Sequence, residues 1–177
     1  FGYGSTGSLV ATSNIVNNSG VVQADVTGVG TVRSWVAATG YGGDKGIFGY
    51  GRGASAKVSM SNLVSNTGVI AADVTGVGTA REKLAAAGYG GDKGIFGYGF
   101  DGSNKVSMTN LVSNTGVISA DVSGVGTARE ALAAASYGGD KAIFGYGTTG
   151  SRVSLTNLVS NSGVVAADVS GVGTARD

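Results

Sequence analysis

Short runs of alternating apolar and polar residues fill the chain, and they predict β-strands. In one such run, residues 45–51, the alternation places Phe48 and Tyr50 on one face of a strand. Two further runs, residues 58–66 and 69–74, are rich in valine and other strand-forming residues. The triplet Asn-Thr-Gly between these two runs is a turn signal, so we expect an antiparallel hairpin there.

This pattern occurs four times along the chain. A Phe-Gly-Tyr-Gly motif begins at Phe1, Phe48, Phe96 and Phe144, and a second motif begins at Asn14, Asn62, Asn110 and Asn157. The second motif has the same length in every copy, whereas the distance from Phe to Asn varies by one residue. A segment that tolerates insertion within an otherwise constant repeat indicates a surface loop.

One stretch of the repeat fits either a helix or a strand. Thr79 and Glu82 have the spacing of a helix-capping pair, and Gly88 stands where a helix would end. The equivalent stretch of the first copy has no capping glutamate and carries Trp35 and Val36, which favour a strand. Because the copies must share one fold, and because a helix of about eight residues is marginal, we predict a strand.

Each repeat then contains four predicted strands, a to d. In the third repeat they span residues 84–89 (a), 93–99 (b), 106–113 (c) and 116–122 (d). The predicted fold is all-β, a β-propeller of four-stranded antiparallel blades of about 48 residues each. The chain is a single array with repeats at 1–34, 35–82, 83–130 and 131–177. Since the sequence begins inside a strand b, we expect one blade to lack its innermost strand.

The repeat resembles the kelch repeat of β-propeller proteins. The resemblance rests on Arg129, on the short strand Leu132-Ala-Ala-Ala135, on Tyr137-Gly138-Gly139, and on the strand from Asp140 to Gly147. Two features depart from the kelch pattern: Gly-Tyr-Gly replaces the usual double glycine, and the tryptophan of strand d is absent. These departures bear on blade curvature and ring size. A weaker resemblance is to near-identical tandem-repeat propellers of phage and environmental microbial proteins, which suggests an extracellular or virion surface.

Composition excludes several functions. The net charge is +1 and no basic run occurs, so we expect no nucleic-acid partner. The chain has no His and no Cys, which removes the commonest nucleophile–base pairs and metal ligands. We predict no catalytic residue, no metal and no cofactor. Gly97-x-Gly99-x-x-Gly102 matches a dinucleotide-binding pattern, but a strand follows where a helix is required. No apolar run is long enough for membrane insertion.

Aspartate and arginine recur eight residues apart in every repeat. Because these residues are equivalent in all copies, whereas a catalytic site needs distinct roles, we interpret them as structural ion pairs between blades. They are Asp25 and Arg33, Asp73 and Arg81, Asp121 and Arg129, and Asp168 and Arg176.

The repeats differ at two places, the b–c loop and the connection from strand d to the next strand a. In an antiparallel blade both places emerge at the same end, so the differences are expected on one face. Charged and aromatic side chains on surface loops are typical of binding, although drift at unconstrained positions explains them equally well. The candidate binding residues are Trp35, Arg52, Lys57, Lys83, Phe100, Asp101, Lys105 and Arg152.

These observations predict a non-catalytic binding module with a protein or glycan partner. The alternative is a purely structural or self-assembling repeat protein, natural or engineered, that has no ligand. An array with open sheet edges is also expected to associate with further copies, or to belong to a longer repeat chain that closes the ring.

Overall fold

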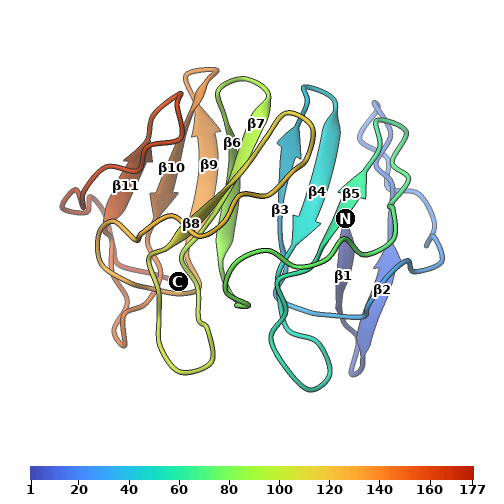
Figure 1. Cartoon of the computed structure of the whole chain (residues 1–177), viewed down its shortest axis with the longest axis horizontal. Helices are drawn as coiled ribbons and strands as arrows, with labels where there is room; N and C mark the ends of the chain where they lie inside the picture. The colour runs from blue at the N-terminus through green and yellow to red at the C-terminus, as the bar shows by residue number, and fades with distance from the viewer.

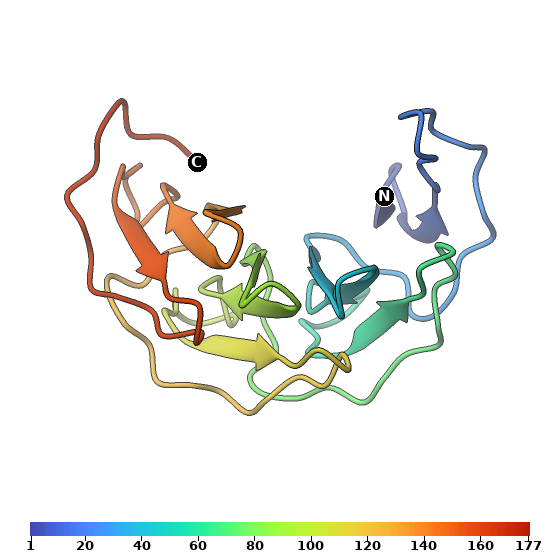
Figure 2. The same ribbon diagram turned by 90° about the horizontal axis from the view of Figure 1, so that it is seen from above.

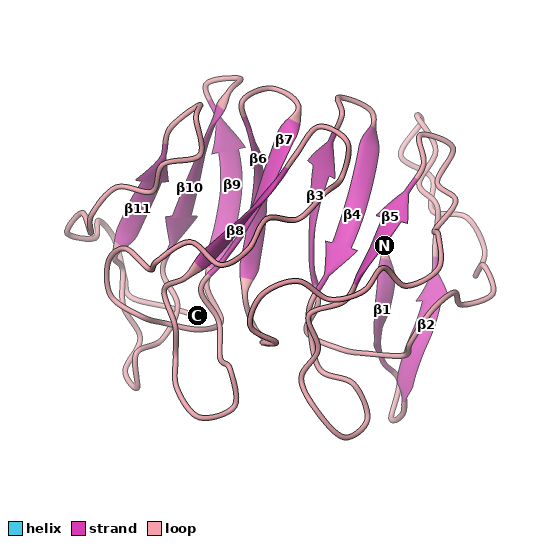
Figure 3. Cartoon of the chain, in the orientation of Figure 1, coloured by secondary structure: helices cyan, strands magenta, loops and turns pink.

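The computed structural model describes residues 1–177 and contains strands but no helix. The strands form four small antiparallel sheets, one in each of the ranges 1–34, 35–82, 83–130 and 131–177, which we call units 1 to 4 (Figures 1 and 3). They are β1 (Gly2–Ser5) and β2 (Leu9–Ser13); β3 (Ala37–Tyr41), β4 (Lys45–Gly49) and β5 (Ser61–Val64); β6 (Ala85–Tyr89), β7 (Lys93–Gly97) and β8 (Thr109–Val112); and β9 (Ala133–Tyr137), β10 (Lys141–Gly145) and β11 (Thr156–Val159). The structure has no helix that is long and apolar enough to cross a membrane.

The four sheets stand side by side along an arc (Figure 2). Strands β3, β6 and β9 line its concave side, and each pairs with the strand that follows it in the sequence. These inner strands have the sequences Ala-Ala-Thr-Gly-Tyr, Ala-Ala-Ala-Gly-Tyr and Ala-Ala-Ala-Ser-Tyr, so all residues before the final tyrosine are small. Small side chains allow neighbouring sheets to approach closely at the crowded inner side of an arc.

The stretch that fits either a helix or a strand forms strand β6. Its residues pair with β7 from Ala85 opposite Gly97 to Tyr89 opposite Lys93. The side chains of Ala85 and Ala87 are both buried. Burial against neighbouring strands decides the conformation here, because tertiary packing outweighs the weak helix propensity of a short alanine run.

The prediction of four-stranded sheets is wrong, since units 2 to 4 have three strands and unit 1 has two. The predicted strand d does run beside strand c, but only two isolated bridges join them in unit 3, Val112 to Ile118 and Thr109 to Val122. Between these two bridges, strand c advances by three residues and segment d by four. The extra residue in segment d forms a β-bulge, which interrupts the ladder. Between the bridges, the Asn110 side chain donates to the Ser119 carbonyl in place of a backbone bond.

Strand b also ends earlier than predicted, because the tyrosine of each Phe-Gly-Tyr-Gly motif has a left-handed backbone. The φ angles of Tyr50 and Tyr98 are 62° and 63°. Such a residue leaves the strand, so the predicted alternation ends at the glycine before it. The tyrosine instead packs edge-to-face on the phenylalanine of the following unit, with 5.3 Å between the ring centroids of Tyr50 and Phe96 and 5.1 Å between those of Tyr98 and Phe144.

Glycine within the same motif makes room for that phenylalanine. A Cβ added to Gly97 would lie 2.7 Å from the Cζ atom of Phe144, and Gly49 faces Phe96 in the same way. Gly145 occupies the equivalent position in unit 4, where no phenylalanine of another unit packs against it, and an added Cβ there would be in ordinary contact. The glycine is therefore required by close packing between units.

A second complementary pair lies on the inner side of the junctions. A Cβ added to Gly94 would lie 2.5 Å from Cγ2 of Thr39. One repeat later, the positions of Thr39 and Gly94 are occupied by Ala87 and Ala142, which are both buried in one core cluster. A larger residue thus faces glycine at one junction, and two alanines share the space at the next.

Candidate binding face

The b–c loops and the d-to-a connections meet at one end of the sheets, which we call the variable face. In unit 3, Phe100 pairs with Glu82 on one side and with Lys105 on the other, and Arg52 and Thr148 make equivalent bridges. Figure 1 shows these loops along the lower edge of the arc, with the a–b turns at the upper edge. The positions at which the repeats differ therefore share one face.

Several charged residues of this face contact one another. The Lys57 ammonium lies 3.6 Å from the Glu82 carboxylate and 5.1 Å from the centroid of the Phe100 ring. The Lys105 ammonium lies 3.6 Å from the carboxylate of Glu130. The Glu82 side chain is only 3% exposed, so Lys57 offsets a largely desolvated charge. These lysines therefore have a structural partner within the chain.

The remaining candidates of the variable face differ in their surroundings. Arg52 is exposed and forms no ion pair. Asp101 accepts hydrogen bonds from the backbone amides of Ser103 and Asn104 within its own loop. Arg152 donates to the Asp177 carboxylate at 2.7 Å. Of these three, only Arg52 presents a charge without a partner in the chain.

Trp35 and Lys83 lie at the inner rim of the variable face, directly before strands β3 and β6. The Lys83 ammonium is 4.8 Å from the centroid of the Trp35 ring and 3.3 Å from the Glu130 carboxylate. Trp35 is 50% exposed. Both residues line a cavity of about 290 Å³ together with Val36, Leu84, Ala131 and Leu132. We call this cavity the rim pocket.

The backbone of the rim pocket is held in an unusual conformation. Trp35, Lys83 and Ala131 occupy the same position in successive repeats and have φ angles of 51°, 54° and 54°. A left-handed conformation costs a residue with a side chain about 1–2 kcal/mol. The amide of Ala131 donates to the carbonyl of Lys83, so these two rim positions are joined by a backbone hydrogen bond. The fold thus presents three different side chains at one fixed geometry.

The repeated aspartates and arginines lie at the junctions between units. The pairs join Arg33 to Asp73, Arg81 to Asp121, and Arg129 to Asp168, at 3.6, 3.8 and 3.8 Å. Each arginine therefore faces the aspartate of the following unit, 39 or 40 positions later, and the aspartate eight residues before it faces the preceding unit. Asp25 of unit 1 and Arg176 of unit 4 are the two members of this set that form no such ion pair.

Sequence reasoning missed the other members of each junction. The Arg81 guanidinium donates to the Asn110 side chain and to the carbonyls of Thr79 and Tyr98. It also lies 4.3 Å from the centroid of the Tyr50 ring. The Asn and the Thr of one copy of the second motif belong to different junctions, because the Asn62 side chain accepts from Arg33 whereas the Thr79 carbonyl accepts from Arg81.

Hydrogen bonding determines the ionisation of the junction aspartates. Burial alone would raise the pKa of Asp121, but hydrogen bonds from Thr79 and Asn110, together with Arg81, outweigh it and lower the pKa. Asp73 and Asp168 are lowered for the same reasons. Burial raises the pKa of Tyr98 to about 12, so its phenol remains protonated and donates to the carbonyl of Val125.

The lowered pKa values of these aspartates lead us to expect that the folded chain becomes less stable in acid. Because their folded-state pKa values lie below that of an unfolded aspartate, about 3.9, the unfolded chain binds more protons as the pH falls. Their stabilising contribution is complete above that value and is lost as the pH falls through the folded pKa. We expect the free energy of unfolding to decrease from pH 5 to pH 2, and to decrease less for Asp121→Asn. Denaturant titrations across this range measure both, and identical pH dependence in the two proteins contradicts the assignment.

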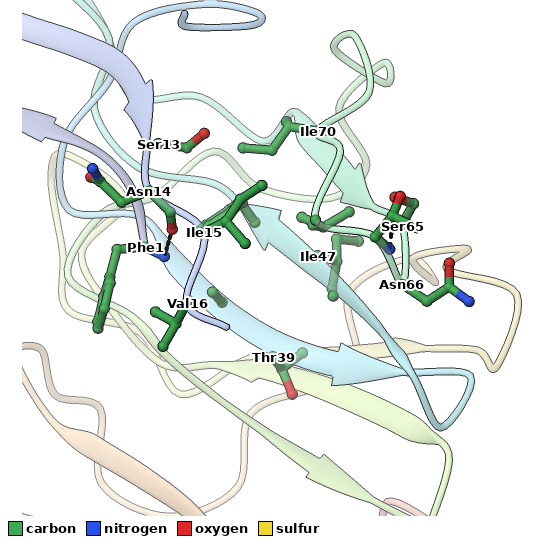
Figure 4. Close-up of a pocket in the computed structure, with 16 residues that line it drawn as sticks. Phe1, Ser13, Asn14, Ile15, Val16, Thr39, Ile47, Ser65, Asn66 and Ile70 are labelled. Atoms are coloured by element: carbon green, nitrogen blue, oxygen red, sulfur yellow. Dashed lines mark hydrogen bonds between the residues drawn. The ribbon is translucent and has the colours of Figure 1, made fainter. Parts of the chain in front are cut away.

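A cavity of about 570 Å³ lies between units 1 and 2 (Figure 4). Its lining includes Phe1, Thr39, Ile47 and Ile70. At the next junction the corresponding space contains the inner strand of unit 2, whose Thr39 packs on Gly94. Unit 1 has no inner strand, so this cavity is the space that such a strand occupies elsewhere in the array.

Comparison with known proteins gives a likeness of fold alone. No protein-family model matches the chain, and no curated protein sequence matches it. Among solved structures, the chain is similar to the one described as "Structure of YjhT", with a TM-score of 0.57 and 15% sequence identity. The likeness covers 77% of this chain and 44% of that one, so the chain spans less than half the length of YjhT.

Proposed function

We propose that the chain is part of a β-propeller and acts as a non-catalytic binding module, with a protein or glycan bound at the variable face. The arrangement of four similar sheets along an arc, with inner strands of small residues, supports the propeller. The similarity of its fold to that of YjhT also supports a propeller. The resemblance of the sequence to kelch repeats points the same way.

The rim pocket carries the proposal for binding. It is concave, and it has apolar walls next to one half-exposed indole and one ammonium group. An indole face provides a stacking surface for a sugar ring or an apolar side chain, and an adjacent lysine provides a hydrogen-bond donor. Tryptophan is also the residue type most enriched at binding hot spots. The same repeat position holds lysine and alanine in the next two units, so the indole is not required by the fold.

Trp35→Ala is expected to weaken binding at this face by at least tenfold, because loss of a central aromatic contact costs roughly 2 kcal/mol or more. Trp35 is the only tryptophan in the chain, so its fluorescence reports directly on the pocket. The experiment is a fluorescence titration of the wild type with a panel of neutral and anionic oligosaccharides and of peptides. Affinity of Trp35→Ala for the hits is then measured by calorimetry.

Tyr137→Ala is the control, because Tyr137 is an exposed aromatic residue outside the rim pocket. Its affinity should equal that of the wild type. If no member of the panel changes the tryptophan fluorescence, or if Trp35→Ala binds the hits as tightly as the wild type, the rim pocket is not the binding site.

The alternative is a structural repeat protein without a ligand. It is favoured by the ion pairs of Lys57 and Lys105, which engage candidate binding residues within the chain. Exchange of Trp35 with Ala131, which occupies the same position in a later repeat, separates the two functions. A binding module loses or changes its ligand on exchange, whereas a structural protein loses only stability.

A further inference from the structure

The first and last units expose opposite halves of the contact that joins successive units. At each of the three junctions, a tyrosine and an arginine of one unit meet a phenylalanine, an asparagine and an aspartate of the next. Unit 4 carries the first set as Tyr146 and Arg176, and unit 1 carries the second as Phe1, Asn14 and Asp25. Figure 2 shows the two units at opposite ends of the arc.

The exposure of these residues distinguishes them from their equivalents. Arg33, Arg81 and Arg129 are completely buried, whereas Arg176 is exposed. Phe1 is 77% exposed, although Phe96 and Phe144 are completely buried. Unit 1 thus exposes the Phe1 ring and the Asp25 carboxylate, and unit 4 exposes the Arg176 guanidinium. The two surfaces are complementary in charge and in kind.

Both halves already have the geometry of a formed junction. The amide of Gly147 donates to the Arg176 carbonyl, as the amide of Gly99 does to Arg129. The Arg176 guanidinium lies 3.7 Å from the centroid of the Tyr146 ring, in the place that Arg129 takes over Tyr98. Little reorganisation is needed before this half meets a partner, which lowers the cost of association.

The acceptor half in unit 1 is equally prepared. The Asn14 side chain donates to the Asp25 carboxylate at 2.8 Å, as Asn110 does to Asp121 at 2.9 Å. At a formed junction this amide and carboxylate receive the arginine and a threonine of the preceding unit. In unit 1 Asp25 is exposed and Asn14 is partly exposed.

We propose that unit 4 of one chain binds unit 1 of a second copy, head to tail, through the same contacts that join units within the chain. Arg176 of the first copy pairs with Asp25 and Asn14 of the second, Thr174 donates to that Asp25, and Tyr146 packs on Phe1. Because each junction turns the array in the same sense, addition of a copy continues the arc. The interface is heterologous, since two different surfaces meet.

Charge reversal at the two ends tests this interface. The wild-type chain is expected to exceed 17.2 kDa in analytical ultracentrifugation as its concentration rises. Arg176→Asp and Asp25→Arg should each weaken association by about 30-fold or more, because each opposes like charges at a desolvated pair. An equimolar mixture of the two variants should associate again, because it restores one native junction between Arg176 of one variant and Asp25 of the other.

Arg52→Asp is the matched control, since it makes the same charge change at an exposed arginine away from both ends, and it should associate as the wild type does. Circular dichroism establishes that each variant is folded. A wild-type chain that remains at 17.2 kDa at every concentration overturns the proposal, and the two surfaces are then left for repeats of the same polypeptide. Unchanged association of both end variants, or a mixture that fails to recover, also overturns it.

Discussion

Arg81→Ala is expected to lower the free energy of unfolding by about 3–5 kcal/mol, because it removes a completely buried side chain and leaves buried hydrogen-bond acceptors without a donor. The Arg81 side chain is completely buried, and its loss leaves the Asp121 carboxylate without its cationic partner and the Asn110 side-chain oxygen without its donor. The loss also opens a space beside the Tyr50 ring. Urea denaturation followed by circular dichroism measures the change.

Arg176→Ala provides an internal control for this measurement. Arg176 follows the same Gly-Val-Gly-Thr-Ala sequence as Arg81 but is exposed, so its substitution should change the free energy of unfolding by less than about 0.5 kcal/mol. Both variants are measured at a dilution at which the chain is monomeric. We attribute the stability to the buried junction around Arg81. If the two substitutions lower the free energy of unfolding equally, this attribution is wrong.

Gly97→Ala is expected to destabilise the chain by about 1–3 kcal/mol, because overpacking forces neighbouring groups to move. The added methyl group meets the ring of Phe144, which is completely buried and has no free space to enter. Alanine would otherwise favour folding over glycine by reducing the entropy of the unfolded chain, so the sign of the change is informative. Thermal unfolding of the two proteins measures it.

Gly145→Ala is the matched control for Gly97→Ala. It places the same methyl group in the same motif, where the nearest atom lies 3.5 Å away on Thr156. The expected change is within about 0.5 kcal/mol of zero, or slightly stabilising. A large loss at Gly145 would show that the strand itself, and not the junction, requires glycine.

The sequence predicted the repeat, the inner strand and the common face of the variable loops. Each of these follows from periodicity, which four copies of one unit make easy to read. It did not predict the end of strand b, because the alternation of residues 45–51 carries no sign of the left-handed backbone at Tyr50, which Tyr146 also adopts although no phenylalanine packs on it. It also did not predict the loss of strand d, since the bulge replaces backbone pairing with a bond from the Asn110 side chain.

The binding face was predicted only in outline. The alternation of variable and constant segments located the face, but it did not separate residues that hold the loops from residues that remain free. Lys57 and Arg52 are both basic and lie in the same loop, yet only Lys57 has an acidic partner in the chain. That partner, Glu82, comes from the connection to the next unit, so the distinction depends on how the units pack.

The complementary sizes of Thr39 and Gly94, and of Ala87 and Ala142, have a consequence for inheritance. Near-identical tandem repeats recombine readily, and unequal exchange deletes or adds whole copies. Deletion of unit 3 would bring Thr39 opposite Ala142, where a threonine needs glycine. The order of the copies is therefore constrained by packing at their junctions, although each copy taken alone is almost interchangeable with the next.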